Sequence, residues 1–323
     1  MCTAINLTLK DNYFGRNLDY EHDFGEQIII TPRNYPIYFR NGRKNQSHYA
    51  IIGMGIISDN YPLYFDASNE KGVSMAGLNF PGSAEYKKAI SEKDNIASFE
   101  LILWVLSQAE NVEEAKRLTE KLNITDEAFS DKMPSSPLHW IIADKHSAIV
   151  IEQTKIGLSV YDNPVGVLTN NPCFDMQMIN VANYMSLSNG EPKNRFSDKI
   201  SIEPYSRGMG GIGLPGDLSS MSRFVRAAFV KLNSEFEHTE TEIIAQFFHI
   251  LASVYQQKGC AKVGEGYEIT NYSSCCNTDK GIYYYTTYYN SSVNAVDMHR
   301  ENLDLKALVS YKLIKKQNIN MCN

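Results

Sequence analysis

The sequence predicts an α+β fold in which helices are layered on two antiparallel sheets. Apolar and polar residues alternate with a period of two at both ends of the 323-residue chain, which is typical of half-buried strands. A block of helical patterns separates these runs of strands. The chain also lacks a Pro/Ser/Gly-rich linker and internal repeats, which favours one domain spanning residues 2–323.

The N-terminal half begins with a predicted hairpin. TAINLTL alternates as a strand, KDN supplies a turn, and YFGRNLD returns as a second strand. Further strands are expected at YAIIGMGII, YPLYFDA and GVSMAGLNF. Two helical stretches follow, SFELILWVLSQA, with Ser98 as its expected N-cap, and VEEAKRLTEKL.

The second half begins with a predicted meander. Strands are expected at LHWIIAD, SAIVIEQT, LSVYDN and VGVLTN, because short connections with Lys, Gly or Asn-Pro separate them. Two longer helices are predicted from about Ser220 to Leu232 and from about Glu240 to Gln256. The chain then returns to strands at YEITNYSS, GIYYYTTYY and VNAVDM.

Composition and charge exclude several classes of function. The 31 basic and 37 acidic residues give a net charge of −6 with no long run of either sign, which argues against nucleic acid as a partner. No signal peptide pattern opens the chain, and the longest apolar run, Leu101–Leu106, is far shorter than the ~20 residues that span a bilayer. We therefore expect a cytoplasmic protein without membrane contact.

Metal and nucleotide chemistry find little support in the sequence. The six cysteines include no CxxC pair, and the seven histidines include no HExxH, so neither a metal nor a cofactor is expected. GMGGIG, from Gly208 to Gly213, fits the dinucleotide pattern G-x-G-x-x-G. A polar segment precedes it and no helix starts on it, which favours a flexible glycine loop over a nucleotide site.

The cysteine at position two raises the main question about function. If the hairpin is symmetric about Asp11, Tyr20 lies opposite Cys2, Asp19 lies within about one residue of it, and Arg16 shares its face. Read separately, Cys2 is a small strand residue, and Arg16 with Asp19 is a surface ion pair of little energetic value. Read together, the three residues favour a functional site.

Removal of Met1 would turn Cys2 into an N-terminal nucleophile. The residue would then carry a thiol, with a reference pKa of about 8.5, and an α-amine, with a reference pKa of about 7.7–8.0. The amine can act as a general base, and Arg16 can stabilise the thiolate. Asp19 can orient the ammonium group. One small hairpin therefore holds the groups that covalent amide hydrolysis requires.

Ordered motifs along nearly the whole chain resemble one known family. The motifs are MCTAI, YFGRNLDYE, ITPRNY, MAGLNFPG, DNPVGVLTNNP, GGIGLPGDLSSMSRFVRAAF, QFFHIL and KGIYYYTTY. They are similar to those of the choloylglycine hydrolase family, which includes bile salt hydrolases and penicillin V acylases. The resemblance implies an N-terminal-nucleophile hydrolase of four layers, αββα, whose two antiparallel sheets lie between helices. It also implies a homotetramer.

The resemblance also implies a catalytic set, none of which is substituted here: Cys2, Arg16, Asp19, Asn79, Asn170 and Arg223. Because TNNP contains two asparagines, Asn171 remains an alternative to Asn170. Asparagine side chains can donate to the oxyanion that forms when an amide is attacked. Arg223 falls in the first turn of a predicted helix, where the dipole disfavours a cation, which suggests an anionic partner. The structural alternatives are that Asn79 and Asn170 only form turns and that Arg223 is a solvated surface arginine.

The implied substrates are glycine- and taurine-conjugated bile salts. Asparagine at position 79 resembles bile salt hydrolases, whereas penicillin V acylases tend to carry tyrosine there. A rigid steroid needs an apolar slot, for which the candidates are Leu18, Tyr20, Phe65, Phe129 and Leu138. Penicillin V acylase activity and non-catalytic binding of amphipathic anions remain the alternatives. The intact polar set argues against a mere binder, which needs no nucleophile.

Overall fold

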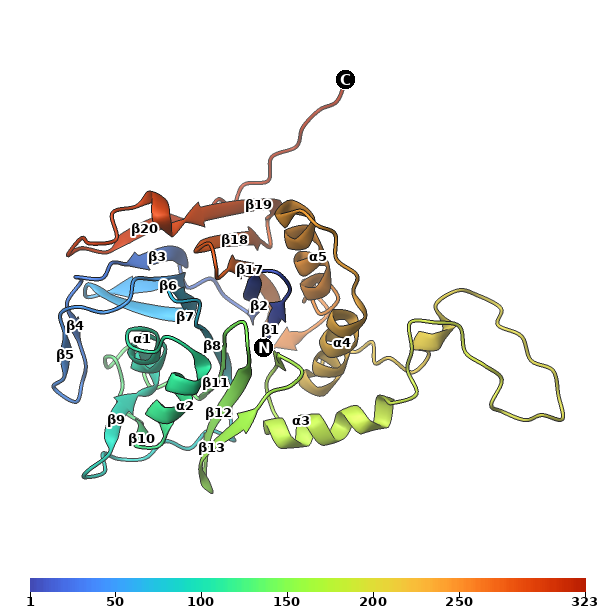
Figure 1. Ribbon diagram of the computed structural model, residues 1–323, viewed down its shortest axis with the longest axis horizontal. Helices are drawn as coiled ribbons and strands as arrows, with labels where there is room; N and C mark the ends of the chain where they lie inside the picture. The colour runs from blue at the N-terminus through green and yellow to red at the C-terminus, as the bar shows by residue number, and fades with distance from the viewer.

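The computed structural model covers residues 1–323 and is built around a six-stranded sheet that carries the N-terminus (Figure 1). Its strands are β1 (Cys2–Thr8), β2 (Asn12–Tyr20), β14 (Val167–Leu168), β17 (Ile269–Asn277), β18 (Ile282–Thr287) and β19 (Asn290–Asp297). The order is β14-β1-β2-β17-β18-β19, and all neighbours are antiparallel. The strand that begins with Cys2 is therefore interior, between β14 and β2.

A second antiparallel sheet has eight strands. They are β3 (Gln27–Thr31), β6 (Ile51–Ser58), β7 (Tyr61–Asn69), β8 (Ser74–Asn79), β11 (Leu138–Ala143), β12 (Ala148–Thr154), β13 (Gly157–Asp162) and β20 (Val309–Lys312). Their order is β13-β12-β11-β8-β7-β6-β3-β20. Three small ribbons pair β4 (Ile37–Tyr38) with β5 (Lys44–Asn45), β9 (Asp94–Ala97) with β10 (Leu122–Thr125), and β15 (Lys262–Val263) with β16 (Gly266–Tyr267).

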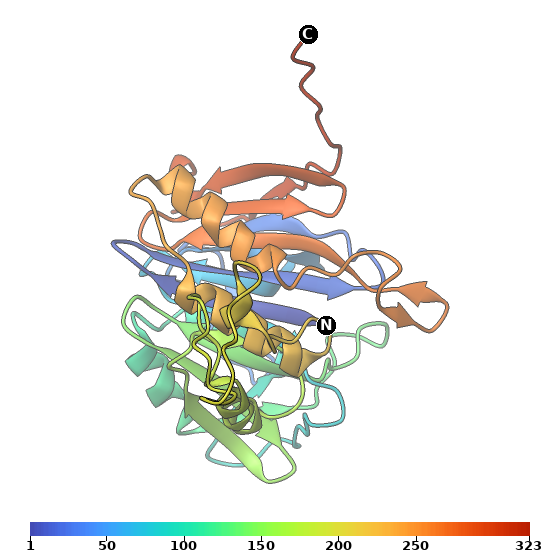
Figure 2. The same ribbon diagram turned by 90° about the vertical axis from the view of Figure 1, so that its right-hand side faces the viewer.

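Helices complete the outer layers (Figures 1 and 2). The α-helices are α1 (Leu101–Leu106), α2 (Val112–Thr119), α3 (Phe174–Val181), α4 (Ser220–Asn233) and α5 (Glu240–Ala252), and the 3₁₀ turns are η1 (Ser98–Glu100), η2 (Ala182–Tyr184), η3 (Met209–Gly211) and η4 (Met298–Arg300). Helices α4 and α5 pack on the six-stranded sheet, and α1 and α2 pack on the eight-stranded sheet. The predicted αββα architecture is confirmed.

Two hydrophobic cores follow from this layering. The inner core joins the two sheets to α4 and α5 and contains Cys2, Leu18 and Leu78. The outer core lies between the eight-stranded sheet and α1 and α2 and contains Tyr64 and Trp140. Alternate residues of the eight-stranded sheet therefore face opposite cores.

Some elements differ from those expected from the sequence. Strand β3 was not predicted, because QIIIT does not alternate. Ile28 and Ile30 contribute to the inner core while Ile29 contributes to the outer core, so both faces need apolar residues. The prediction of Ser98 as an N-cap was wrong. Ala97 occupies that position, and the Glu100 carboxylate accepts the Ala97 N–H at 3.1 Å.

The buried Asp66 on β7 links the two sheets. Its carboxylate accepts hydrogen bonds from the hydroxyls of Tyr272 (2.6 Å), Tyr283 (2.6 Å) and Ser274 (3.1 Å), which belong to the six-stranded sheet. Burial raises the pKa of Asp66, and the nearby Arg16 and these hydrogen bonds oppose that shift. The carboxylate is thus both a shared acceptor and a counterion.

We expect Asp66→Ala to lower the free energy of unfolding by about 3–5 kcal/mol, because three buried hydroxyls lose their acceptor and a buried arginine loses a negative neighbour. Urea denaturation of this variant and of Asp131→Ala, which removes an exposed carboxylate, checks this. Equal midpoints for the two variants would mean that the Asp66 network contributes nothing to stability.

The segment between η2 and η3 projects away from the layered body (Figure 1). It exposes Met185, Phe196 and Tyr205, each with about five-sixths of its surface accessible (84–85%). The glycine-rich GMGGIG segment follows as the short turn η3, and no strand leads into it. This geometry agrees with a loop rather than a nucleotide site. None of the helices combines the length and apolar character needed to cross a bilayer.

Candidate active site

The β1-β2 hairpin brings the predicted N-terminal residues together, but in a different register. Leu18, and not Tyr20, lies opposite Cys2, because the turn is centred on Lys10, one residue earlier than expected. Arg16 pairs with Ala4 and shares the face of Cys2, as predicted. Asp19 lies opposite Met1, and its N–H donates to the Met1 carbonyl at 2.9 Å.

Cys2 lies at the start of β1 with 3% of its surface exposed and its thiol free. The Arg16 guanidinium is fully buried on the same face, where Nη1 donates to the carbonyls of Phe65 (2.9 Å) and Gly77 (2.6 Å). Burial would lower the pKa of Arg16, but negative charge on Cys2, Tyr272, Asp66 and Asp19 raises it instead. Arg16 Nη2 has no hydrogen-bond partner, so it is available to a thiolate or a substrate oxygen.

Asn170 connects four parts of the site. It follows β14, and its Oδ1 accepts from the Cys2 nitrogen at 2.8 Å and from Arg223 Nη2 at 2.7 Å. Its Nδ2 donates to the carbonyl of Asn79 at 2.6 Å. These contacts fix the orientation of the Asn170 amide, because both donors face its oxygen and the one acceptor faces its nitrogen. Asn170 therefore presents an oxygen, and not an N–H, to the nitrogen of Cys2.

Arg223, from the first turn of α4, lies on the opposite side of β1 from Arg16. Its Nη1 donates to the Cys2 carbonyl at 2.5 Å and to Thr3 Oγ1 at 2.7 Å. It also lies 4.0 Å from Asp19 Oδ2, an oxygen without a hydrogen bond. Burial raises the pKa of Asp19, and Arg223 is the main opposing influence. The buried arginine thus has the anionic partner that the sequence suggested.

Met1 precedes β1 and is held next to these residues by two contacts. Its ammonium donates to the Asp19 carbonyl at 2.7 Å and forms an ion pair with Glu268. Burial lowers the pKa of this ammonium. While Met1 is attached, the nitrogen of Cys2 is an amide and cannot act as a base. Loss of Met1 would create an amine that already faces Asn170 Oδ1.

Asn79 ends β8, and Asn170 Nδ2 contacts its carbonyl. The Asn79 side chain is half-buried and has no hydrogen bond within the protein, so its amide N–H is free to donate. Asn171 is engaged elsewhere, because its Nδ2 donates to the Pro81 carbonyl (2.9 Å) and to Ser83 Oγ (2.8 Å). The structure therefore places Asn170, and not its neighbour, at Cys2.

Three of the five predicted apolar residues lie near the nucleophile, namely Leu18, Tyr20 and Phe65. Leu18 is opposite Cys2, and Phe65 is joined to Arg16 through its carbonyl. Phe24, which the sequence did not single out, packs between Tyr20 and Phe65 with its ring tilted against both, and the ring centroids are 4.8 Å and 5.5 Å away. This aromatic group carries an exposed apolar edge, since Phe24 is 38% exposed.

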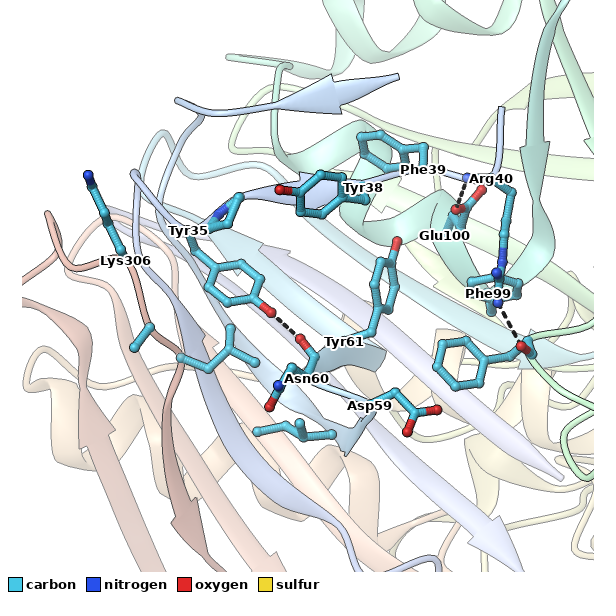
Figure 3. Close-up of a pocket in the computed structure, with 15 residues that line it drawn as sticks. Tyr35, Tyr38, Phe39, Arg40, Asp59, Asn60, Tyr61, Phe99, Glu100 and Lys306 are labelled. Carbon is cyan, nitrogen blue, oxygen red and sulfur yellow. Dashed lines mark hydrogen bonds between the residues drawn. The ribbon is translucent and has the colours of Figure 1, made fainter. Parts of the chain in front are cut away.

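Of the other two apolar candidates, Leu138 lies opposite Asn79 on the neighbouring strand β11 and packs on the outer core, whereas Phe129 lies elsewhere. Phe129 packs against Tyr61 and Phe99 and lines a cavity of about 1020 Å³ beneath Tyr38 and Arg40 (Figure 3). Tyr61 also packs on the outer core, whereas Cys2 is in the inner core, so this cavity lies on the other side of the eight-stranded sheet.

Sequence reasoning missed several residues that hold this site together. Ser220 Oγ accepts the Asn170 N–H at 2.8 Å, and Gln177 Nε2 donates to the Asn170 carbonyl at 3.1 Å. Ser220 carried a signal, because it begins a predicted helix. Gln177 and Glu268 carried none, since a buried polar side chain is recognised only through its partners.

Comparison with known proteins agrees with this geometry. Residues 2–311 match the model of the family described as linear amide C–N hydrolases, choloylglycine hydrolase family. A protein of Lactiplantibacillus plantarum named bile salt hydrolase/transferase is 57% identical over 97% of each chain. A protein of the same name from Clostridium perfringens is 42% identical over the full length of both chains.

Solved structures show the same relationship. A variant of the conjugated bile acid hydrolase from Clostridium perfringens superposes with a TM-score of 0.92 and 40% identity, covering both chains completely. The penicillin V acylase from Agrobacterium tumefaciens superposes with a TM-score of 0.77 over 96% of this chain and 91% of its own, at 20% identity, and so shares the fold. The chain belongs to the choloylglycine hydrolase family of linear amide C–N hydrolases.

Proposed function

We propose that this protein hydrolyses the amide bond of glycine- and taurine-conjugated bile salts through a thioester on Cys2. The observation that carries the proposal is the convergence of the Cys2 nitrogen and Arg223 on Asn170 Oδ1, beside a buried thiol. Relatives 57% and 42% identical to this chain are named for bile salt hydrolysis, which supports the choice of substrate.

In the first half of the reaction, the Cys2 thiol transfers its proton to the α-amine, and the thiolate attacks the substrate carbonyl. Arg16 stabilises the thiolate, and the unpartnered amide of Asn79 donates to the oxyanion. The C–N bond then breaks as the Cys2 ammonium returns its proton to the departing glycine or taurine nitrogen. A cholyl thioester remains on Cys2.

In the second half, the α-amine takes a proton from a water molecule, which attacks the thioester carbonyl. The C–S bond breaks, free bile acid departs, and the proton returns to the thiolate. Asn170 Oδ1 holds the amine in place through both halves, and Arg223 and Asp19 hold Asn170 and the start of β1. Asp19 also supplies the negative charge that balances the ammonium.

The decisive experiment combines intact mass with product release. The purified protein should lack one methionine and should release glycine and taurine from conjugated bile salts. Hydrolysis of penicillin V under the same conditions is the matched assay. A processed protein that is inert to bile salts but cleaves penicillin V would retain the mechanism and change the substrate. A protein inert to both would contradict the proposed hydrolysis and favour the alternative of a non-catalytic binder.

The aromatic group around Phe24 is the proposed contact for the steroid. We expect Phe24→Ala to raise KM for bile salts about tenfold or more and to change kcat little, because the ring is part of an exposed apolar edge near Cys2. Phe129→Ala truncates a similar ring on the other side of the eight-stranded sheet and should leave KM within about twofold. The opposite result, with KM raised only by Phe129→Ala, would assign the steroid to the cavity of Figure 3.

We also propose that the projecting segment mediates assembly into a homotetramer. Phe196 and Tyr205 are each 84% exposed on a segment that stands away from the body. Large exposed apolar side chains grouped on one surface are typical of protein contacts. Light scattering after size exclusion should give the mass of four chains, and Phe196→Asp should reduce it.

A further inference from the structure

A buried histidine and a buried glutamate lie on neighbouring strands of the eight-stranded sheet and contact the segment that contains Asn170. His139 on β11 and Glu152 on β12 have no exposed surface. His139 Nδ1 lies 2.9 Å from Glu152 Oε1, and His139 Nε2 lies 2.9 Å from the carbonyl of Thr169. Phe80 stacks on the imidazole at 4.1 Å with the rings 5° from parallel, which fixes the ring plane.

The hydrogen bonds define how many protons the pair holds. The Thr169 carbonyl can only accept, so Nε2 carries a hydrogen. Glu152 Oε1 also accepts the N–H of Phe174 at 3.0 Å. The contact between Nδ1 and Oε1 needs one further proton, either on an imidazolium or on a carboxylic acid. One proton is therefore shared between His139 and Glu152.

The two contacts of this pair flank Asn170. Thr169 immediately precedes Asn170, and Phe174 begins α3, the helix that supplies Gln177 to the Asn170 carbonyl. We infer that His139 and Glu152 are a positioning pair, which holds Asn170 where its Oδ1 can orient the Cys2 amine. This inference rests on the proposed function, because it deepens the role of the same site.

The eight-stranded sheet reaches Asn170 in two ways, directly through the Asn79 carbonyl at 2.6 Å and through the pair, which holds the residues on either side of Asn170. The other neighbours of Glu152 are the half-buried Cys173 and Tyr161, beside which the exposed Asp175 also lies. Burial, together with the carboxylates of Glu152 and Asp175, raises the pKa of Cys173 to about 11, so this thiol is neutral near pH 7. It therefore does not replace Glu152 as the hydrogen-bond partner of His139.

The test compares two substitutions that differ in hydrogen bonding. His139→Leu removes both donors. It should lower kcat between about 10-fold and 100-fold, because small misplacements of a positioned group have effects of this size, and KM should change little. In Glu152→Gln, an amide oxygen at the Oε1 position can still accept the Phe174 N–H, but a neutral His139 then donates to only one of its two partners, so one of the three contacts is lost. Its kcat should therefore fall less than that of His139→Leu.

The matched control is His48→Leu, which removes another buried histidine whose two nitrogens contact the carbonyls of Tyr35 and Tyr49, outside the site. It should lose stability and keep its kcat. The assays use processed protein with glycocholate, and a parallel measurement follows iodoacetamide alkylation of Cys2 by peptide mass. We expect alkylation to slow in His139→Leu in parallel with kcat, and to slow less in Glu152→Gln.

Folded His139→Leu with unchanged kcat and unchanged Cys2 alkylation would overturn the inference. So would a Glu152→Gln variant as impaired as His139→Leu, because the glutamine variant loses only one of the contacts around Asn170. If His139→Leu fails to fold, the comparison of Glu152→Gln with Glu152→Leu decides, since the leucine variant also loses the acceptor for Phe174 and should lose clearly more kcat. Wild-type protein inert to glycocholate would instead contradict the proposed function, while the alkylation measurement would still test the pair.

Discussion

Replacing Cys2 with serine is expected to abolish turnover, with kcat falling by at least about 10⁴-fold, the scale seen when a nucleophile is removed. Serine fits the space of a residue that is 3% exposed at the start of β1, so the fold should be unchanged. A hydroxyl, however, is far less acidic than a thiol, so a site in which Arg16 stabilises a thiolate forms far less of the attacking anion from serine. Release of glycine from glycocholate and the melting temperature measure the two properties separately.

Two further proteins make this experiment specific. Cys260→Ser changes an exposed cysteine and should keep full activity. A chain with lysine inserted between Met1 and Cys2 retains its methionine and keeps the Cys2 nitrogen in a peptide bond. It should be as inactive as Cys2→Ser, because the thiol is present but the base is not. Undiminished turnover in the inserted chain would contradict the role of the amine.

The hairpin shows how far local reasoning reaches. Alternation predicted both strands, the shared face of Cys2 and Arg16, and the proximity of Asp19. The register was wrong by two residues because the three-residue turn Leu9–Asp11 is centred one position before the expected residue. A shift of two keeps every side chain on its face, which is why the shared face of Cys2 and Arg16 was predicted correctly from the wrong register.

The rest of the site depends on contacts between residues far apart in the sequence. Asn170 reaches Cys2 because β14 pairs with β1, and although a strand was predicted at VGVLTN, no local pattern indicates which strand it pairs with. Asn79, Asn170 and Arg223 therefore came from the family resemblance. The same limit applies to Phe129, because an apolar residue in a loop gives no sign of which face of the sheet it will cover.

Asn79→Ala is expected to lower kcat by about 10²–10³-fold, equivalent to about 2.7–4 kcal/mol of transition-state stabilisation, with little change in KM. The Asn79 side chain has no hydrogen bond in the protein, and the contact from Asn170 Nδ2 is to its backbone carbonyl. Truncation should therefore leave the fold and Asn170 in place. The variant loses only the donor to the oxyanion, and the oxyanion exists only while the substrate carbonyl is under attack.

The neighbouring amides provide the controls for this prediction. Asn79→Asp keeps the shape but replaces the donor with a negative charge, so it should be at least as impaired as alanine, because a carboxylate repels an oxyanion. Asn171→Ala removes an amide that contacts Pro81 and Ser83 instead of Asn79 or Cys2, and it should change kcat little while lowering stability. If Asn79→Ala retains kcat within about fivefold of wild type, the donor must come from elsewhere in the site. The Asp19 N–H, which is freed when Met1 departs, would then be the next group to test.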